Sequence, residues 1–284
     1  MKFGLVVEGG ANRSIFACGA MDALLENGIF ADYFIGTSAG IANGISYLSK
    51  QPRRNMEILE RYVNDRRYMG KRHLLNPFNR SYYNRQFVFA DIPAQYVPFD
   101  FDAFAAYPGR AVAVVTNMLT GQAEYREVER DDPEFRVLQA SCALPLLFPK
   151  IVLDGIPYMD GGVCDSIPFR HAMEEGCDRI LVLLTREKGY RKQPEKALEL
   201  AEKRYRKYPQ FCAALHNRTE AYNRSVDELD ALEAKGTVLT IRPADTAHFG
   251  RLERDIKKIR TFYQEGYEQT IQRLPEIRAY LQEK

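Results

Sequence analysis

Hydrophobic and polar residues alternate in blocks that predict strands and helices in turn along the first part of the chain. Four unbroken apolar runs have the composition of strands buried on both faces: residues 2–7, 33–38, 110–118 and 178–185. The first two runs are followed by segments with apolar residues at helical spacing, residues 14–28 and 39–50. Strand, turn and helix in this order predict an α/β fold with a mostly parallel central sheet.

The middle of the chain is less regular. Residues 52–108 are aromatic and basic and contain several prolines, so they are interpreted as a cap or an insertion. Residues 132–145 predict a further helix that begins at Asp132, because Asp is a common N-cap and Pro133 suits the first helical position.

The last third of the chain has the pattern of long, charged, amphipathic helices. A segment typical of an edge strand, residues 236–245, interrupts them once. We therefore expect an α/β core over residues 1–190 and a mostly helical C-terminal part, residues 191–284, packed on that core.

Composition and charge narrow the class of protein. The 284-residue chain is 45% hydrophobic and 27% charged, as globular proteins are, and its net charge of +2 lacks the basic excess of nucleic-acid-binding proteins. Five scattered cysteines without a C-x-x-C pair favour reduced thiols over disulfides or a zinc site. No apolar run reaches the roughly 18 residues of a membrane span. We expect a soluble cytoplasmic protein that contacts a membrane only peripherally, at its inner face, and binds no nucleic acid.

Ser38 is the first candidate for chemistry. It lies in a Gly-x-Ser-x-Gly sequence, Gly36 to Gly40, between a predicted strand and a predicted helix. A nucleophile elbow needs small residues such as Ala39 around the serine, since the tight turn leaves no room for bulky neighbours. The flanking Thr37 belongs to the same turn. Taken alone, Ser38 is equally well a residue of an ordinary glycine-rich bend.

The loop after the first strand is the second candidate. Gly9 and Gly10, followed by Ala11, Asn12 and Arg13, offer backbone N–H groups that can bind an anion. The loop lacks the Gly-Lys-Ser/Thr ending of a phosphate-binding P-loop and does not match G-x-G-x-x-G. It suits an oxyanion hole, and a plain turn before a helix explains the same residues equally well.

Asp160 is the third candidate. It ends a short predicted strand and is followed by Gly161 and Gly162, which let the backbone turn back. An Asp in this place either accepts the proton of a serine or only stabilises its own turn.

Together with the segment Ser141 to Pro145, these three stretches resemble the patatin-like phospholipase family. The resemblance implies a three-layer α/β/α fold and a Ser–Asp dyad without histidine. Matched to the family's motifs, Ser38 is the nucleophile, Asp160 its partner, and Gly9 to Arg13 the oxyanion loop. The sequences of residues 180–194 and 250–267 look like a bacterial cytoplasmic subgroup with a helical C-terminal extension.

The loop departs from the family pattern at Ala11 and Ser14, where the family commonly has glycine. If such a position needs a positive φ, an alanine there costs roughly 1–2 kcal/mol. Loss of one oxyanion donor slows a reaction about 10²–10³-fold. The sequence therefore predicts an enzyme that works slowly because of these two residues.

The resemblance implies hydrolysis of fatty-acyl esters and an acyl lipid or ester as the binding partner. No carboxylate–histidine cluster with metal-ligand spacing appears in the sequence, so we expect no metal, and no other cofactor. Two alternatives stay open. His248 follows Ser38 and Asp160 in the chain order of the triad of α/β-hydrolases. A lipid- or acyl-binding regulatory protein of the same fold, weakened in catalysis, also explains Ala11 and Ser14. The aromatic and basic residues 62–104 either form an apolar mouth with a basic rim or pack as a cap on the core.

Overall fold

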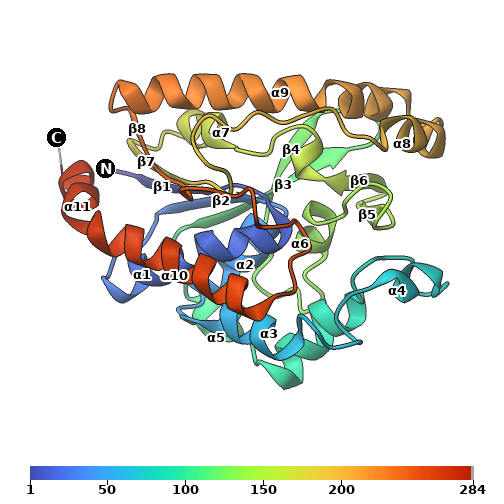
Figure 1. Ribbon diagram of the computed structural model, residues 1–284, viewed down its shortest axis with the longest axis horizontal. Helices are drawn as coiled ribbons and strands as arrows, with labels where there is room; N and C mark the ends of the chain where they lie inside the picture. The colour runs from blue at the N-terminus through green and yellow to red at the C-terminus, as the bar shows by residue number, and fades with distance from the viewer. Residues whose placement is uncertain (283–284) are drawn as a thin grey trace.

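The computed structural model describes residues 1–282, and eight strands in this part of the chain form one central sheet (Figure 1). They are β1 (Phe3–Val7), β2 (Tyr33–Thr37), β3 (Arg110–Asn117), β4 (Ala123–Glu127), β5 (Ile151–Leu153), β6 (Ile156–Asp160), β7 (Arg179–Leu183) and β8 (Val238–Ile241). Strands that pair with one another follow the path β5-β6-β3-β2-β1-β7-β8, and β4 also pairs with β3, along the edge opposite β2 and β6. Strands β1, β2, β3, β7 and β8 pair in parallel, whereas β4, β5 and β6 join by antiparallel pairings. The predicted mostly parallel sheet is confirmed.

Helices cover both faces of this sheet. The α-helices are α1 (Ile15–Glu26), α2 (Ala39–Leu48), α3 (Arg54–Tyr62), α4 (Lys71–Leu75), α5 (Phe101–Ala105), α6 (Arg136–Ser141), α7 (Phe169–Glu174), α8 (Leu198–Tyr205), α9 (Pro209–Ala234), α10 (Ile256–Gln272) and α11 (Leu274–Gln282). Segments of other helix types are η1 (Ala11–Ser14), η2 (Phe87–Tyr96) and η3 (Gly161–Val163). None of the helices within residues 1–282 combines the length and apolar composition that crossing a membrane requires.

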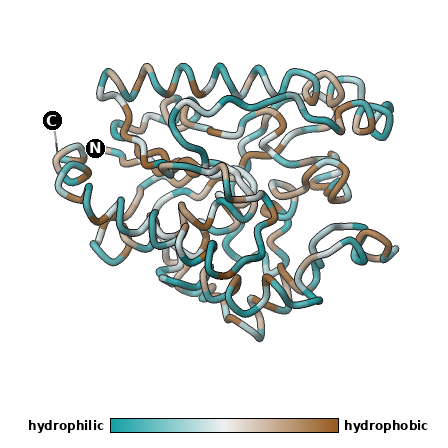
Figure 2. Tube along the Cα trace, viewed as in Figure 1, coloured by the Kyte–Doolittle hydropathy of each residue, from teal (hydrophilic) through white to brown (hydrophobic). Residues whose placement is uncertain are grey.

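Alternate residues of the central strands supply two separate cores. On β1, Leu5 and Val7 join the core built with α1, α2 and α10, whereas Val6 joins the core built with α7 and α9. Figure 1 shows α7 and α9 on one side of the sheet and α1, α2 and α10 on the other. Hydrophobic residues gather along the strands between them (Figure 2). A sheet buried on both faces by helices is the predicted three-layer α/β/α fold, which is confirmed.

The C-terminal helices and strand are built into this core. Strand β8 extends the sheet beside β7, as expected of an edge strand in residues 236–245. Helix α10 lies against α1 so closely that a Cβ atom on Gly19 would be 2.0 Å from the carbonyl oxygen of Tyr263. Only glycine allows this approach. The division of the chain into two parts at residue 190 stays a prediction.

Two local expectations differ from the structure. Helix α6 begins at Arg136 rather than at Asp132, because Phe135 adopts a left-handed conformation with φ 51°. This conformation places the ring of Phe135 against Phe99 and Phe101, with centroids 5.3 and 5.5 Å away. The Asp132 carboxylate still accepts hydrogen bonds from the backbone N–H groups of Glu134 and Arg136, so it caps the turn that precedes the helix. Residues 52–108 are also more helical than expected, since they contain α3, α4, η2 and α5.

Asp22 is a buried carboxylate that ties three helices together. Its side chain, only 4% exposed, accepts hydrogen bonds from the hydroxyl of Tyr263 on α10 and from the backbone N–H of Arg53 before α3. Burial raises its pKa from 3.8 to about 6, against the opposing effect of these two hydrogen bonds. The ionised form is therefore less favourable in the folded protein than in the unfolded chain.

We expect Asp22→Asn to change the pH dependence of the free energy of unfolding. A carboxyl whose folded pKa is raised destabilises the protein once it ionises, so wild type should gain stability relative to the variant as pH falls from about 7 to about 4. The relative gain should be of the order of 2 kcal/mol. Urea unfolding of both proteins at several pH values measures it. If the difference in unfolding free energy between the two proteins stays constant across this pH range, the pKa of Asp22 is not raised in the folded protein.

Candidate active site

Ser38 lies in a sharp turn between β2 and α2, with backbone angles φ 55° and ψ −126°. Its two neighbouring glycines have no room for a side chain. A Cβ atom would lie 2.6 Å from the backbone nitrogen of Ile41 if added to Gly36, and 2.4 Å from the carbonyl oxygen of Val7 if added to Gly40. The strained serine conformation is thus held by close backbone packing, as in a nucleophile elbow.

The hydroxyl of Ser38 donates a hydrogen bond to Asp160, with 2.7 Å between Oγ and Oδ2. Strand β3 brings the two residues together, because β2 and β6 pair with the same edge of it, opposite β4. The last residue of β2, Thr37, pairs with Val114, and Asp160 at the end of β6 pairs with the next residue, Val115. The ends of the two strands therefore meet, and the predicted pair Ser38 and Asp160 is in direct contact.

Asp160 is held in a fixed orientation in the protein interior. It is 1% exposed, and its Oδ1 accepts a hydrogen bond of 2.7 Å from the backbone N–H of Gly162, while Gly161 begins the short turn η3. Burial raises the pKa of Asp160, while nearby Arg218 and the hydrogen bond from Ser38 oppose the shift. A carboxylate with a raised pKa is a stronger base towards the serine hydroxyl.

Ser141 positions the backbone of Ser38. The sequence indicated Ser141 only as part of the small-residue segment Ser141 to Pro145. Its hydroxyl oxygen accepts a hydrogen bond of 2.8 Å from the backbone N–H of Ser38 and donates one of 2.7 Å to the carbonyl oxygen of Val114. Ser141 is completely buried at the end of α6. It therefore links the elbow to β3. No pattern in the sequence around Ser141 predicted this contact.

The predicted oxyanion loop connects β1 to α1 and passes beside Ser38. Three of its backbone N–H groups already have acceptors: Gly9 donates to the oxygen of Ser166 at 3.4 Å, Asn12 to that of Arg251 at 3.1 Å and Arg13 to that of Gly10 at 3.1 Å. The N–H groups of Gly10 and Ala11 donate to nothing within residues 1–282. Ala11 and Ser38 line the same cavities. Two backbone donors are thus available near the serine hydroxyl.

The two departures from the family pattern differ in their backbone requirements. Ser14 has φ −63°, an ordinary helical value that needs no glycine. Ala11 has φ 50° and so occupies the left-handed region that glycine favours. The strain foreseen for an alanine is present at residue 11 and absent at residue 14.

We expect Ala11→Gly to raise the free energy of unfolding by up to about 1 kcal/mol. The gain from removing left-handed strain, roughly 1–2 kcal/mol, is partly cancelled by the greater freedom of glycine in the unfolded chain. Ala11→Val should destabilise the protein, because a β-branched residue fits this conformation worse than alanine. Chemical denaturation of the three proteins tests this. An Ala11→Val variant as stable as wild type would show that residue 11 is not left-handed.

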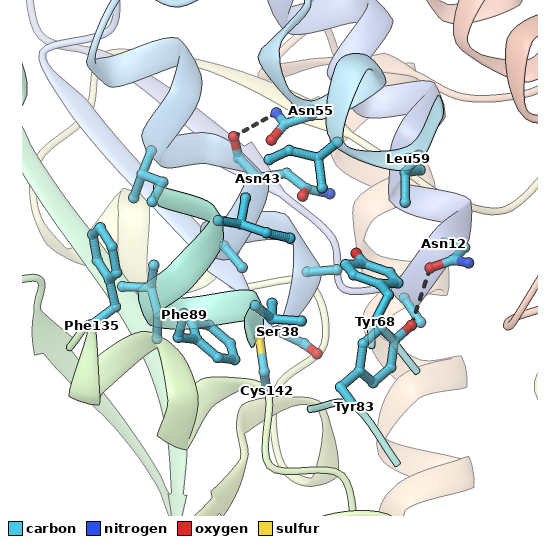
Figure 3. A pocket seen from close by; sticks show the side chains of 18 of the residues that line it. Asn12, Ser38, Asn43, Asn55, Leu59, Tyr68, Tyr83, Phe89, Phe135 and Cys142 are labelled. Carbon is cyan, nitrogen blue, oxygen red and sulfur yellow. Dashed lines mark hydrogen bonds between the residues drawn. The ribbon is translucent and has the colours of Figure 1, made fainter. Parts of the chain in front are cut away.

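An apolar cavity opens beside Ser38 (Figure 3). Its lining includes Ile45 on α2, Ile58 on α3, Val88 and Phe89 on η2, and Phe135 and Leu138 around the start of α6. Two of its lining residues bond to each other, since the hydroxyl of Tyr83 donates a hydrogen bond of 3.1 Å to the side-chain oxygen of Asn12. Within residues 62–104, Tyr68, Tyr83 and Phe89 line the cavity, and Phe87 is buried in the core. A basic rim formed by this segment stays a prediction.

No histidine within residues 1–282 hydrogen-bonds to Ser38 or Asp160 in this structure. His248 is exposed, His216 is near Glu202, and His171 stacks on Tyr125 with 3.7 Å between ring centroids. His73 is buried, with Nε2 3.0 Å from the carbonyl oxygen of Arg66. Nor do the described residues contain a cluster of three acidic, histidine or cysteine side chains arranged for a metal ion. The five cysteines are free thiols here.

Comparison with known families identifies the class of the protein. The family model described as "Patatin-like phospholipase" matches residues 5–173, so the chain belongs to the patatin-like phospholipase family. This confirms the resemblance expected from the sequence. Membership connects the protein with lipid acyl hydrolases at the level of the family. Residues 208–282 match a second family model, described as a domain of unknown function (DUF6363).

Individual related proteins share little sequence identity with this chain. Uncharacterized protein YjjU of Escherichia coli (strain K12) is 26% identical over 188 residues, which are 65% of this chain and 52% of that protein. The match thus spans about half the length of this curated relative. The crystal structure of VipD from Legionella pneumophila aligns with 97% of this chain and 67% of its own, with a TM-score of 0.48 and 14% sequence identity.

Proposed function

We propose that the protein is a serine hydrolase that cleaves fatty-acyl esters with a Ser38–Asp160 dyad. The observation that carries the proposal is the 2.7 Å hydrogen bond from the Ser38 hydroxyl to the buried Asp160, beside an apolar cavity. A buried carboxylate that accepts this proton in its ionised form can act as a general base. The acyl chain of the substrate would occupy the apolar cavity, because burial of its methylene groups is favourable there.

The proposed reaction has two stages. Ser38 Oγ attacks the ester carbonyl while its proton passes to Asp160, and the N–H groups of Gly10 and Ala11 stabilise the negative oxygen that forms. Asp160 then gives the proton to the departing alcohol, which leaves an acyl group on Ser38. In the second stage Asp160 takes a proton from water, whose oxygen attacks the acyl group. The proton returns to Ser38 as the fatty acid departs.

A fluorophosphonate probe tests the dyad. Wild type should be labelled, Ser38→Ala should not, and Asp160→Asn should be labelled at least about 10²-fold more slowly, which is the usual loss of a general base. The matched control His248→Ala should react like wild type, because its exposed imidazole has no contact with the dyad. Fast labelling of Asp160→Asn together with loss of labelling in His248→Ala would overturn the dyad in favour of a triad.

The pH dependence of labelling follows from the raised pKa of Asp160. Only the ionised carboxylate accepts the serine proton, so the rate should fall as pH decreases through this pKa. The fall should begin at a higher pH than the ordinary aspartate value of about 4 would give. Absence of labelling at every pH from about 5 to about 9 would favour the alternative. In that case the protein would be an acyl-binding regulator, whose weakened catalysis is attributed to Ala11.

We further propose that the projecting segment around α4 brings the protein to its lipid substrate. Leu75, the last residue of α4, and Phe78 are 85% and 96% exposed. Residues 66–90 contain six arginine or lysine residues and no aspartate or glutamate. In Figure 2 this projection carries hydrophobic positions among hydrophilic ones. Its later residues, including Val88 and Phe89, line the apolar cavity. Exposed apolar side chains within a basic segment are suited to binding an anionic membrane surface.

We expect the double variant Leu75→Ser and Phe78→Ser to bind vesicles that contain phosphatidylglycerol at least about tenfold more weakly than wild type, since two apolar side chains no longer insert. The control is Met173→Ser. Met173 is exposed on α7, which covers the opposite side of the sheet from α3 and α1. Cosedimentation with vesicles measures binding. Equal binding of the double variant and the control would exclude Leu75 and Phe78 as the contact.

A further inference from the structure

A second cavity adjoins the dyad. It shares Ala11, Ser38 and Leu144 with the apolar cavity, but its lining also includes Asp160, and eight of its eighteen lining residues are charged. Five of its lining residues are basic: Arg13, Arg186, Lys192, Arg218 and Arg251. Three are acidic: Glu8, Asp160 and Glu195. Basic side chains therefore outnumber acidic ones beside Ser38, in a protein whose overall charge is nearly balanced.

The acidic residues of this cavity are already engaged. Glu8 accepts hydrogen bonds from the backbone N–H of Thr185 at 2.6 Å and from the hydroxyl of Tyr222 at 2.7 Å. Glu195 forms an ion pair with Arg218 and lies 4.0 Å from Arg251. The carboxylate of Asp160 accepts from Ser38 and Gly162. Glu195 thus pairs with Arg218 and, at the longer distance, with Arg251, while the Glu8 carboxylate raises the pKa of Arg13 and of Lys192 against the effect of burial. The five basic and three acidic groups still leave the cavity with an excess of basic side chains.

Arg13 is the most unusual of these groups. It is only 9% exposed, yet its side chain has no ion pair or hydrogen bond to any residue from 1 to 282, and its Nε is buried without a partner. Burial and the nearby charge of Arg186 lower its pKa to about 10, so it stays protonated at neutral pH. An unpaired buried guanidinium is unfavourable unless an anion joins it.

Arg186 and Lys192 extend the same cluster. Arg186 donates hydrogen bonds to the hydroxyls of Thr246 at 2.6 Å and Tyr190 at 3.3 Å, and within the described chain neither basic residue forms an ion pair. Lys192 lies over the ring of Tyr222, with Nζ 4.3 Å from the centroid. Burial, followed by the charge of Arg218, lowers the pKa of Lys192 to about 7. Arg13, Arg186 and Lys192, which form no ion pair within residues 1–282, thus line one cavity.

We propose that this cavity binds a phosphate or carboxylate group carried by the alcohol part of the substrate. If the acyl chain fills the apolar cavity, the other substituent of the ester carbonyl extends from Ser38 towards the cations. The inference rests on the proposed function, since it assigns the substrate class: acyl esters with an anionic alcohol portion. Charged guanidinium groups bind such oxygens through short, charge-assisted hydrogen bonds.

Four of the five basic residues of this site lie outside the part of the chain that matches the patatin-like model. Arg186, Lys192, Arg218 and Arg251 all follow residue 173, and the last two fall within residues 208–282, the region matched to a domain of unknown function. The C-terminal part of the chain would therefore select the substrate, while the preceding part carries out the chemistry.

Sulfate binding to the Ser38→Ala protein tests the site without any turnover, with affinity measured by calorimetry. The double variant Arg186→Gln and Lys192→Gln should bind sulfate at least about tenfold more weakly, since two charge-assisted contacts are lost. The control Lys188→Gln, whose side chain is 73% exposed and paired with Glu233, should bind as before. Affinity should also fall as pH rises through about 7, because Lys192 loses its proton while sulfate keeps its charge. Equal affinities in the double variant and the control would overturn the proposal.

Hydrolysis then identifies the anion. Three esters with the same acyl chain are compared: a monoacylglycerol, its 3-phosphate and an acylated hydroxycarboxylate. Wild type should show kcat/KM at least about tenfold higher for an anionic ester than for the neutral one, and the double variant should lose this preference, whereas the control Lys188→Gln should keep it. The preferred ester distinguishes phosphate from carboxylate. Equal kcat/KM values for all three would contradict the substrate class. Sulfate binding without hydrolysis of any ester would instead support the anion site and contradict the proposed hydrolase.

Discussion

The pairing of strand β3 with two other strands along one edge is the constraint on which the candidate site depends. Strand β2 ends where β6 begins to pair, so Thr37 and Asp160 lie beside consecutive residues of β3, Val114 and Val115. Backbone hydrogen bonds fix this register, and a slip by one residue would turn the carboxylate to the other face of the sheet. The contact between Ser38 and Asp160 thus follows from sheet topology.

Strain and burial near this junction are tolerated because the surrounding packing is rigid. Ser38 and Ala11 both have positive φ values, and Asp160 is almost fully buried. Each feature is unfavourable on its own. The hydroxyl of Ser141, which joins the backbone of Ser38 to that of Val114, and the turn at Gly162 hold these groups in place. A preorganised site of this kind needs no rearrangement when negative charge develops near it.

The two cavities that meet at Ser38 have opposite characters. Residues of α2, α3 and η2 make one cavity apolar, whereas the segment after β7 and helix α9 bring basic groups to the other. This division gives the proposed substrate a direction, with the acyl chain on one side and the anionic group on the other. The C-terminal helices, which complete the fold on both faces of the sheet, would therefore also complete the site.

Local sequence patterns were sufficient to predict much of this protein. Unbroken apolar runs identified β1, β2, β3 and β7, and the glycines around Ser38 predicted a tight turn, because these signals depend on neighbours in the chain. The start of α6 was mispredicted, since Phe135, whose ring packs on Phe99 and Phe101, adopts a left-handed conformation between Asp132 and the helix. The sequence also did not predict the role of Ser141. Nor did it indicate that Arg13 lacks an ion pair and lines the same cavity as Lys192. These features arise from contacts between residues far apart in the chain, which only the tertiary structure decides.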